Sequence, residues 1–516
     1  MDYLDYVQMT KGQRFVYKLK SFFTGIPKAI VKFFKAIGYF IKKFFIGIGT
    51  FFKNYGSRFA KGDAGTKLSY IIMGAGNIMH GQIVKGLIFL AAEAGYILFL
   101  INFGLHYLTR IYTSDLVLLD SKPDKVTGFY KFGTGAVGKE VAIVQKTMNG
   151  ESVTNAATAD DSNKILLFFI LTIIVTIAFL AVYIANTKSA YATQQIRAEG
   201  KKPVGFIDEL KSFLDDRFHI TLLTLPVLLL IVFTVMPILF TILMAFTNYD
   251  KEHLSPLKLY QWVGLKNFAD VFYADAKKSA TFGRILVWTL IWAFFATFTN
   301  YIFGIIVALM INKKGIKFKA FWRTMFVLTA AVPQFVTLLV MRLLLDDKSG
   351  ALNSAMGTSF PFLTDWANVT VIVVNMWIGI PFTMLITSGL LMNIPEDLYE
   401  SARIDGANAV QQFTKITFPY IFFVTTPYLI TTFVGNINNF NVIFFLTGGG
   451  PEDPTRYSNS AGKTDLLVTW LYKLTVDQSN YRLAAVIGIL VFVVCAIGSL
   501  ITFNMSKASK NEEEFS

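Results

Sequence analysis

Long apolar runs separated by short polar segments dominate the chain. A transmembrane helix needs about 20 predominantly apolar residues to cross the hydrocarbon core of a bilayer. Eight runs reach this length: 85–108, 164–186, 220–247, 285–311, 321–345, 368–392, 420–445 and 481–505. The pattern therefore predicts an all-α polytopic membrane protein with about eight transmembrane helices. The apolar segment 68–84 is shorter and rich in glycine, so we expect a partly inserted or interfacial helix there.

The composition agrees with lipid as the main solvent of the chain. Hydrophobic residues make up 54% and charged residues only 16% of the 516 residues, whereas soluble domains average about 25% charged residues. The single cysteine, Cys495, excludes an intrachain disulfide and a cysteine-based metal site, and the four histidines show no ligand spacing. No catalytic constellation of nucleophile and base, or of paired carboxylates, stands out. We therefore expect no catalytic residue and no metal site, and a chain that is not an enzyme.

The basic residues predict the orientation of the spans. Segment 312–323 places five Lys/Arg in twelve residues, and short loops with such an excess face the cytoplasm. Counting outward from it, both termini are cytoplasmic. The loops 109–163, 248–284, 346–367 and 446–480 are then external. The spans contain almost no ionisable side chain, which disfavours a proton- or ion-driven carrier and favours a transporter energised by another subunit.

The N-terminal region has a local basic excess with a helical apolar pattern. Residues 1–67 contain 13 Lys/Arg and 3 Asp/Glu, a net charge of +10. Phenylalanine pairs recur every 11 residues at 22–23, 33–34 and 44–45, which is about three helical turns, and lysines fall on the opposite arc. This pattern predicts a basic amphipathic helix on an anionic membrane surface. Packing on the protein's own cytoplasmic side remains an alternative, whereas the continuous apolar face disfavours nucleic acid as a partner.

Two glycine-rich segments resemble nucleotide-binding motifs without meeting their requirements. "GTGAVGKE" (133–140) lacks the hydroxyl that binds Mg²⁺ in a phosphate-binding loop, because Glu140 stands in its place. "GAGNIMHG" (74–81) has the wrong glycine spacing for a dinucleotide fingerprint. Neither segment predicts a nucleotide site.

One cytoplasmic stretch, residues 396–419, is polar and compact between two apolar runs. Pro395 suits the start of a helix, which we expect to run to about Arg403. Asp405 and Gly406 then break the helix, and we expect Asp405 to cap a second helix over about 407–415. From the residues alone, this stretch is either an ordinary helical connector or an element that docks a partner.

The same stretch carries a resemblance to a known family. "YESARIDGANAVQQFTKITFP" resembles the cytoplasmic signature of binding-protein-dependent ABC importer permeases, with Ser401 in place of the first alanine and Phe418 in place of the leucine. The resemblance implies the ABC importer permease fold with a core of six spans, and a coupling helix over 396–419 that seats in a cleft of a separate ATPase. The implied ATPase-coupling residues are Glu400, Ser401, Ala402, Asp405, Gly406 and Ala407. ATP and Mg²⁺ would be bound by that ATPase, so no cofactor is expected on this chain.

Three further segments narrow the resemblance. "WIGIPFTMLITSGLLMNIPEDLYE" (377–400), "NINNFNVIFFLTGGGP" (436–451) and "AGKTDLLVTWLYKL" (461–474) are similar to the maltose/maltodextrin permease of the MalF type. The resemblance implies a bacterial plasma-membrane importer of maltodextrin-type oligosaccharides. Its partners would be a second permease subunit, two ATP-binding subunits, an extracellular sugar-binding protein and membrane lipids. That family carries a large external domain between its third and fourth spans, but the corresponding loop 248–284 is short here, so we expect a smaller docking surface.

The resemblance also implies where the sugar binds. Amide groups suit the hydroxyls of a sugar and aromatic rings suit its C–H faces. The implied sugar contacts are Thr432, Gly435, Asn436, Asn439, Ile378, Gly379 and Phe382. The family has an aromatic residue where Gly435 stands and a tyrosine where Phe382 stands. Helix capping or interhelical hydrogen bonding is the other interpretation of the asparagines.

The predicted organisation has four parts. These are a cytoplasmic amphipathic region (1–67), two N-terminal spans with the external loop 109–163 (68–219), the permease core (220–505) and a cytoplasmic tail (506–516). Two other functions stay open: a permease for another oligosaccharide or a polyol, and a membrane anchor or sensor that recruits an ATPase without moving sugar.

Overall fold

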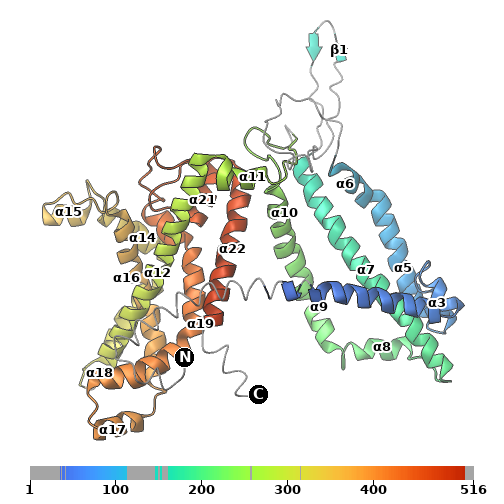
Figure 1. The fold of residues 1–516 in the computed structure, drawn as a ribbon, viewed down its shortest axis with the longest axis horizontal. Coiled ribbons are helices and arrows are strands. Elements are labelled where there is room, and N and C mark those ends of the chain that lie inside the picture. Colours follow the sequence, from blue (N-terminus) through green and yellow to red (C-terminus); the bar gives the residue numbers. More distant parts are fainter. Residues whose placement is uncertain are drawn as a thin grey trace. The chain divides into compact units, whose positions relative to one another are not determined.

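A computed structural model describes the chain in two compact units. The described residues are 35, 38–40, 42–112, 146–148, 151–153, 161–255, 259–313 and 315–505. The core unit comprises Met1–Ala36, Phe268–Ser479 and Val486–Ser516, and the N-terminal unit comprises Ile37–Asn267 and Asn480–Ala485. Figure 1 shows the helices of both units. The segment 133–140, which was compared with a phosphate-binding loop, lies outside the described residues, and so does the predicted tail 506–516.

Three long apolar helical segments form the N-terminal unit. The first, Ile83–Arg110, joins α5 (Ile83–Phe99), η1 (Leu100–Gly104) and α6 (Leu105–Arg110). The second is α7 (Ser162–Ala198), which begins where the Asp161 carboxylate accepts the backbone N–H groups of Asn163 and Lys164. The third, Phe218–Met244, joins α9 (Phe218–Leu230), η3 (Ile231–Val235) and α10 (Met236–Met244). The first two segments contain the predicted spans 85–108 and 164–186, although α7 continues well beyond residue 186, and the third covers the predicted span 220–247 up to Met244.

The segment 68–84 differs from the single helix that we expected. It contains the end of α3 (Ala64–Leu68) and all of α4 (Ala75–Met79), joined by turns. Asn186 of α7 accepts the Gly74 N–H at 2.9 Å and donates to the Ser69 carbonyl at 2.9 Å. Helix breaks rich in glycine expose backbone groups, and here a side chain of the neighbouring helix satisfies them. The connection between α7 and α9 carries one more short helix, α8 (Phe206–Ser212).

A short β-hairpin adds to the predicted all-α architecture. Strands β1 (Lys146–Met148) and β2 (Glu151–Val153) pair antiparallel, with Lys146 opposite Val153. They belong to the predicted external loop 109–163, most of which lies outside the described residues.

The core unit is built around α12 (Ala276–Asn312), which packs against α16 (Ala367–Leu391) and α19 (Phe418–Ile437). The short elements α11 (Lys266–Ala269) and η4 (Asp270–Ala274) precede α12, and α22 (Tyr481–Met505) is the last helix described. Among the described residues, seven helices are long and apolar enough to cross a membrane, or eight if one bent pair counts as a span. This agrees with the predicted number of about eight.

The bent pair corresponds to the predicted span 321–345. Helices α13 (Lys319–Ala331) and α14 (Gln334–Leu344) meet at an angle of 83°. Val332 is extended and Pro333 follows it, because the proline ring disfavours helical backbone in the residue before it. The prediction of one continuous helix was wrong at this position.

The predicted span 420–445 is also broken. Helix α19 ends at Ile437, and α20 (Phe440–Leu446) begins after Asn439. The Asn439 side chain accepts the Val442 N–H, which makes it the N-cap of α20. Asparagine favours such positions because its side chain replaces a missing backbone partner.

Segments 436–451 and 461–474, which carry part of the family resemblance, pack together beyond α20. The Thr464 N–H donates to the Gly449 carbonyl at 3.1 Å. The buried Asp465 carboxylate accepts the Gly462 N–H and pairs with the Lys473 ammonium, each at 2.7 Å. Burial raises the pKa of Asp465, and the neighbouring Lys473 acts in the opposite direction. Three short helices, α15 (Ala351–Met356), α21 (Leu467–Tyr472) and η6 (Lys473–Asp477), complete the core unit apart from the connection between α16 and α19, which is described below.

Candidate functional site

A cavity of about 180 Å³ lies between four helices of the core unit. Its lining comes from α12, α14, α16 and α19: Thr297, Asn300, Gln334, Asn375, Ile378, Gly379, Phe382, Thr383, Tyr428, Leu429, Thr432 and Asn436. Amides, hydroxyls, aromatic rings and aliphatic side chains are all present. None of these residues carries a charge at neutral pH, so the lining suits a neutral polar ligand.

Two asparagines present unpaired polar atoms in this lining. Asn300 and Asn375 are 7% and 4% exposed, and Asn300 Oδ1 and Asn375 Nδ2 have no hydrogen-bond partner among the described residues. A buried polar group without a partner is costly. Asn300 Oδ1 is an acceptor and Asn375 Nδ2 is a donor. A sugar hydroxyl can donate to the first and accept from the second.

Gly379 lets α12 and α16 approach closely beside the cavity. A Cβ added at Gly379 would lie 2.0 Å from Asn300 Nδ2. Any side chain at this position would displace the Asn300 amide, so the glycine fixes where that amide sits. A polar contact also joins α16 to α19, where the Thr383 and Tyr428 hydroxyls are 3.4 Å apart.

The structure brings together most of the residues that the sequence singled out as sugar contacts. Ile378, Gly379, Phe382, Thr432 and Asn436 line the cavity. Gly435 and Asn439 do not, and a Cβ added at Gly435 would meet no atom within 4 Å.

Asn436 and Asn439 have different surroundings. The Asn436 side chain donates to Thr297 Oγ1 at 2.9 Å, and the Asn436 backbone carbonyl accepts the Trp292 indole N–H at 3.0 Å. Asn439 donates to Asn436 Oδ1 at 3.2 Å and caps α20. Asn436 therefore borders the cavity, whereas Asn439 supports Asn436 and the helix break.

Sequence reasoning missed several lining residues: Thr297, Asn300, Gln334, Asn375, Thr383, Tyr428 and Leu429. A helical spacing would have found part of this set. Asn375, Gly379 and Phe382 recur at intervals of four and three residues, as do Tyr428, Thr432 and Asn436 at intervals of four, so each group shares one helix face. Gln334 follows the break at Pro333, which the apolar pattern does not reveal.

For the importer that the family resemblance implies, we predict that Asn439→Ala lowers uptake through loss of both the cap of α20 and the hydrogen bond to Asn436 Oδ1. Asn439→Asp should restore only the part that depends on the cap, because a carboxylate cannot donate to Asn436 Oδ1. Alanine removes the N-cap, which costs about 1 kcal/mol, whereas the aspartate carboxylate still accepts the Val442 N–H. Initial rates of labelled-sugar uptake in cells with equal amounts of each variant test this. Equal loss in both variants would show that the donation from Asn439 Nδ2 to Asn436 Oδ1, and not the cap of α20, supports uptake.

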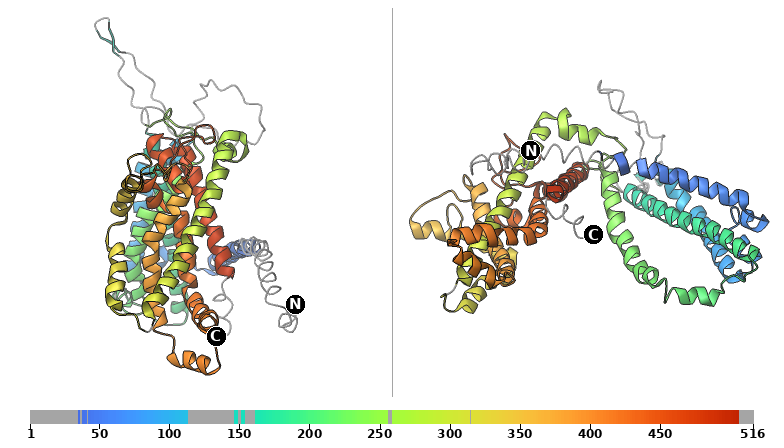
Figure 2. Two further views of the ribbon diagram at one scale, coloured as in Figure 1. Left: turned by 90° about the vertical axis from the view of Figure 1, so that its left-hand side faces the viewer. Right: turned by 60° about the horizontal axis from the view of Figure 1, so that its bottom comes forward.

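The predicted cytoplasmic stretch forms a helical elbow that connects α16 to α19. It consists of α17 (Glu396–Ile404), α18 (Ala409–Gln412) and η5 (Phe413–Thr417), and we call α17, α18 and the turn between them the elbow. Figure 1 and Figure 2 show α17 beyond the ends of the core helices.

The turn of the elbow follows a well-defined helix-ending geometry. The Ala407 N–H donates to the Ala402 carbonyl at 2.8 Å and the Gly406 N–H to the Arg403 carbonyl at 3.0 Å. This is the Schellman arrangement, with a left-handed residue after the helix. Gly406 has φ +76°, which glycine adopts without the steric cost that a Cβ brings.

The expected cap of the second helix was wrong. Asp405 is the C-terminal cap of α17, and Asn408 caps α18 through a capping box with Gln411. The shift arises because Gly406 and Ala407 are still needed to close the first helix, so the second helix starts later.

The elbow exposes both polar and apolar side chains. Glu400, Ser401, Asp405 and Gly406 are exposed, and Ala402 and Ala407 are half-buried. Ile404 and Val410 are 87% and 70% exposed on either side of the turn. The elbow therefore offers an apolar contact surface that the described residues leave uncovered.

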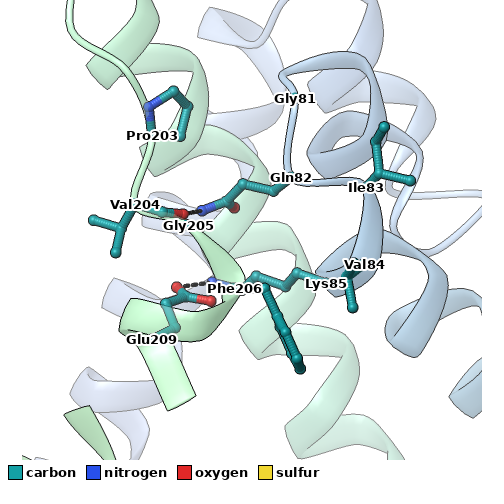
Figure 3. A pocket seen from close by; sticks show the side chains of 10 residues that line it. All are labelled: Gly81, Gln82, Ile83, Val84, Lys85, Pro203, Val204, Gly205, Phe206 and Glu209. Atoms are coloured by element: carbon teal, nitrogen blue, oxygen red, sulfur yellow. Dashed lines mark hydrogen bonds and ion pairs between the residues drawn. The ribbon is translucent and has the colours of Figure 1, made fainter. Parts of the chain in front are cut away.

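A second cavity, of about 190 Å³, lies in the N-terminal unit between the start of α5 and the start of α8. Figure 3 shows that its polar side chains already pair with protein groups. The Gln82 amide donates to the Val204 carbonyl at 3.0 Å, and the Lys85 ammonium pairs with Glu209 at 2.5 Å. These contacts leave little polar capacity for a ligand. Across the described ranges no group of three or more His, Cys, Asp or Glu side chains could hold a metal ion.

The chain is similar to several characterised permeases. Residues 300–509 match the family described as binding-protein-dependent transport system inner membrane component. The galactooligosaccharides transport system permease protein GanP of Bacillus subtilis is 38% identical over 361 residues, covering 68% of this chain and 85% of GanP. The maltodextrin transport system permease protein MdxF of the same organism is 35% identical over 459 residues, covering 86% of this chain and 95% of MdxF. A solved chain of a bacterial alginate ABC transporter matches with a TM-score of 0.47 at 23% identity, covering 58% of this chain and 96% of that chain.

Proposed function

The chain belongs to the family of binding-protein-dependent ABC importer permeases of the MalF type, and we propose that it forms, with a second permease subunit, the membrane pathway for a neutral oligosaccharide of the maltodextrin type. The observation that carries this proposal is the uncharged cavity between α12, α14, α16 and α19, with its unpaired acceptor on Asn300 and donor on Asn375. Tyr428 and Phe382 add aromatic faces to the same lining.

One connected set of helices would both bind the sugar and respond to the ATPase. Helices α16 and α19 both line the cavity, and the elbow joins their ends. An ATP-hydrolysing subunit seated on the elbow would move both helices together when it closes, and this movement would change the cavity and its access. Two such subunits would bind the ATP and Mg²⁺, and this chain would supply no cofactor and no catalytic group.

An extracellular sugar-binding protein would deliver the substrate to the external side. The loop 248–284 is too short to contain a large docking domain. In the proposed orientation, the packed loops around Asp465 and the short helices α15 and α21 would lie on the external side of the core unit. We therefore propose that docking uses this smaller surface.

A galactooligosaccharide is the second candidate substrate, because GanP shares the higher identity over the residues that it matches. Uptake of labelled maltotetraose and labelled galactotetraose by the importer, assembled with its own binding protein and ATPase, separates the two. Inhibition of labelled maltotetraose uptake by unlabelled galactotetraose would favour the second candidate. If neither sugar is taken up while the ATPase subunits stay bound, the alternative of a membrane anchor or sensor replaces the importer.

The chain is a multi-pass membrane protein, and we propose that both termini and the elbow face the cytoplasm. Single cysteines at Ser354 and Gln411, in a Cys495→Ser background, test this orientation because both positions are exposed. An impermeant thiol reagent should label Ser354→Cys in intact cells and should label Gln411→Cys only after the membrane is opened. The reverse pattern would place the elbow outside and contradict ATPase docking there.

A further inference from the structure

The helix over residues 42–61 in the N-terminal unit carries an uncovered stripe of phenylalanine side chains. Phe45, Phe52 and Phe59 recur every seven residues and are 65%, 63% and 46% exposed. At 3.6 residues per turn, residues seven apart lie on the same helix face. Exposed aromatic stripes of this kind mark a contact surface, since isolated apolar residues would not share one face.

Lysines border this stripe. Lys42 and Lys53 project roughly 60–100° further around the helix than the nearest phenylalanines. Both are exposed, and neither has a carboxylate partner among the described residues. Lys85 of the same unit, in contrast, is paired with Glu209. The charges of Lys42 and Lys53 are thus available to an external anion beside an apolar surface.

Contacts with α7 fix the C-terminal part of this helix at one level of the N-terminal unit. The Tyr55 and Tyr183 hydroxyls are 3.0 Å apart, and the Gln194 amide donates to the Lys61 carbonyl at 3.3 Å. Tyr183 lies in the last turn of the predicted apolar run 164–186, and Gln194 lies in the polar part of α7 that follows. The helix over 42–61 crosses α7 instead of running along it (Figure 1). Its end therefore lies where α7 passes from hydrocarbon to water.

We infer that this helix binds the anionic phospholipids of the cytoplasmic leaflet, with Phe45, Phe52 and Phe59 among the acyl chains and Lys42 and Lys53 on the headgroups. An apolar stripe bordered by lysines is the arrangement that holds helices in the interfacial plane, and anionic headgroups attract such lysines. A protein partner could bind this helix at any height along α7. The Tyr55–Tyr183 and Lys61–Gln194 contacts instead hold the helix where α7 passes from hydrocarbon to water. The inference goes beyond sugar transport and depends only on the proposed orientation, which the cysteine-labelling experiment tests separately.

The test uses the full chain in nanodiscs with a spin label at Phe52→Cys in a Cys495→Ser background. In nanodiscs containing phosphatidylglycerol, we expect the label to be several-fold more accessible to oxygen than to a water-soluble nickel chelate. In phosphatidylcholine alone, this preference should be weaker. A label at Lys53→Cys should show the opposite preference, because it faces the headgroups and water.

Charge-removing variants decide whether the lysines act. Lys42→Gln with Lys53→Gln should reduce the preference of the Phe52 label in phosphatidylglycerol to its value in phosphatidylcholine. The matched control, Lys201→Gln with Lys202→Gln, removes two exposed lysines elsewhere in the same unit and should leave the preference unchanged. A label that is equally open to the nickel chelate in both lipids, or shielded from both reagents by protein, overturns the inference. If the preference of the Phe52 label for oxygen changes neither with the lipid charge nor with the lysine substitutions, the electrostatic part of the inference is overturned.

Discussion

Gly406→Asp is expected to abolish sugar uptake while the chain remains folded in the membrane. Gly406 follows α17 with φ +76°, and a Cβ added there would meet no described atom within 4 Å. The substitution therefore causes no clash within the chain, and its conformational strain is about 1–2 kcal/mol. The added carboxylate would instead project from the elbow between Ile404 and Val410, both of which are exposed. A charge placed in an apolar contact surface blocks close docking of a partner.

Two measurements separate lost docking from lost folding. Purified complex carrying Gly406→Asp should retain a normal amount of this chain, but should either lose its ATPase subunits or hydrolyse ATP without stimulation by the sugar-loaded binding protein. Gly200→Asp is the matched control, because Gly200 also follows a long helix, has φ +75° and has open space around an added Cβ. This control should transport normally. Normal stimulated hydrolysis and uptake in Gly406→Asp would refute the assignment of the elbow as the coupling element.

Prolines show why helix breaks in this chain could not be predicted from the sequence. Pro226, Pro381 and Pro427 lie inside α9, α16 and α19 without ending them, whereas Pro333 separates α13 from α14. In a membrane protein, neighbouring helices and side chains can satisfy the backbone groups that a proline frees. Whether a proline ends a helix therefore depends on its tertiary neighbours. The apolar runs themselves predicted the spans well, because their length is set by the bilayer.

The asparagines at 436–441 show the same limit at the cavity. The sequence indicated several amides on one continuous helix, but the chain breaks at Asn438. Asn438 donates to Cys495 Sγ at 3.3 Å and Asn441 to Gln334 Oε1 at 3.2 Å, so only Asn436 of this group lines the cavity. Asn300 and Asn375 meet there because Gly379 lets α12 and α16 approach, and no local pattern reveals a contact between helices so far apart in sequence.

The strongest test of the cavity is replacement of each unpaired amide by a group of similar shape without polar atoms. Asn300→Leu and Asn375→Leu should each lower the rate of oligosaccharide uptake by about 10- to 100-fold, because a sugar hydroxyl left without its partner costs about 1–3 kcal/mol and 1.4 kcal/mol corresponds to about tenfold. The stability of the sugar-free protein should stay the same or rise. Asn300 Oδ1 and Asn375 Nδ2 have no partner within the described structure, so their removal leaves no other group unpaired.

A structural asparagine should respond in the opposite way. Asn267, which is 2% exposed, donates to the Ala245 carbonyl at 2.8 Å and to the Thr247 carbonyl at 2.7 Å. Asn267→Leu would leave both carbonyls bare and should lower the midpoint of thermal unfolding, which reports the cost of about 1–3 kcal/mol for such a group. Uptake per folded molecule should change little, because Asn267 does not line the cavity. If Asn300→Leu and Asn375→Leu destabilise the purified chain as Asn267→Leu does and leave uptake per folded molecule unchanged, the two amides are structural and the sugar binds elsewhere. Loss of uptake with retained stability is the result that only a ligand contact explains.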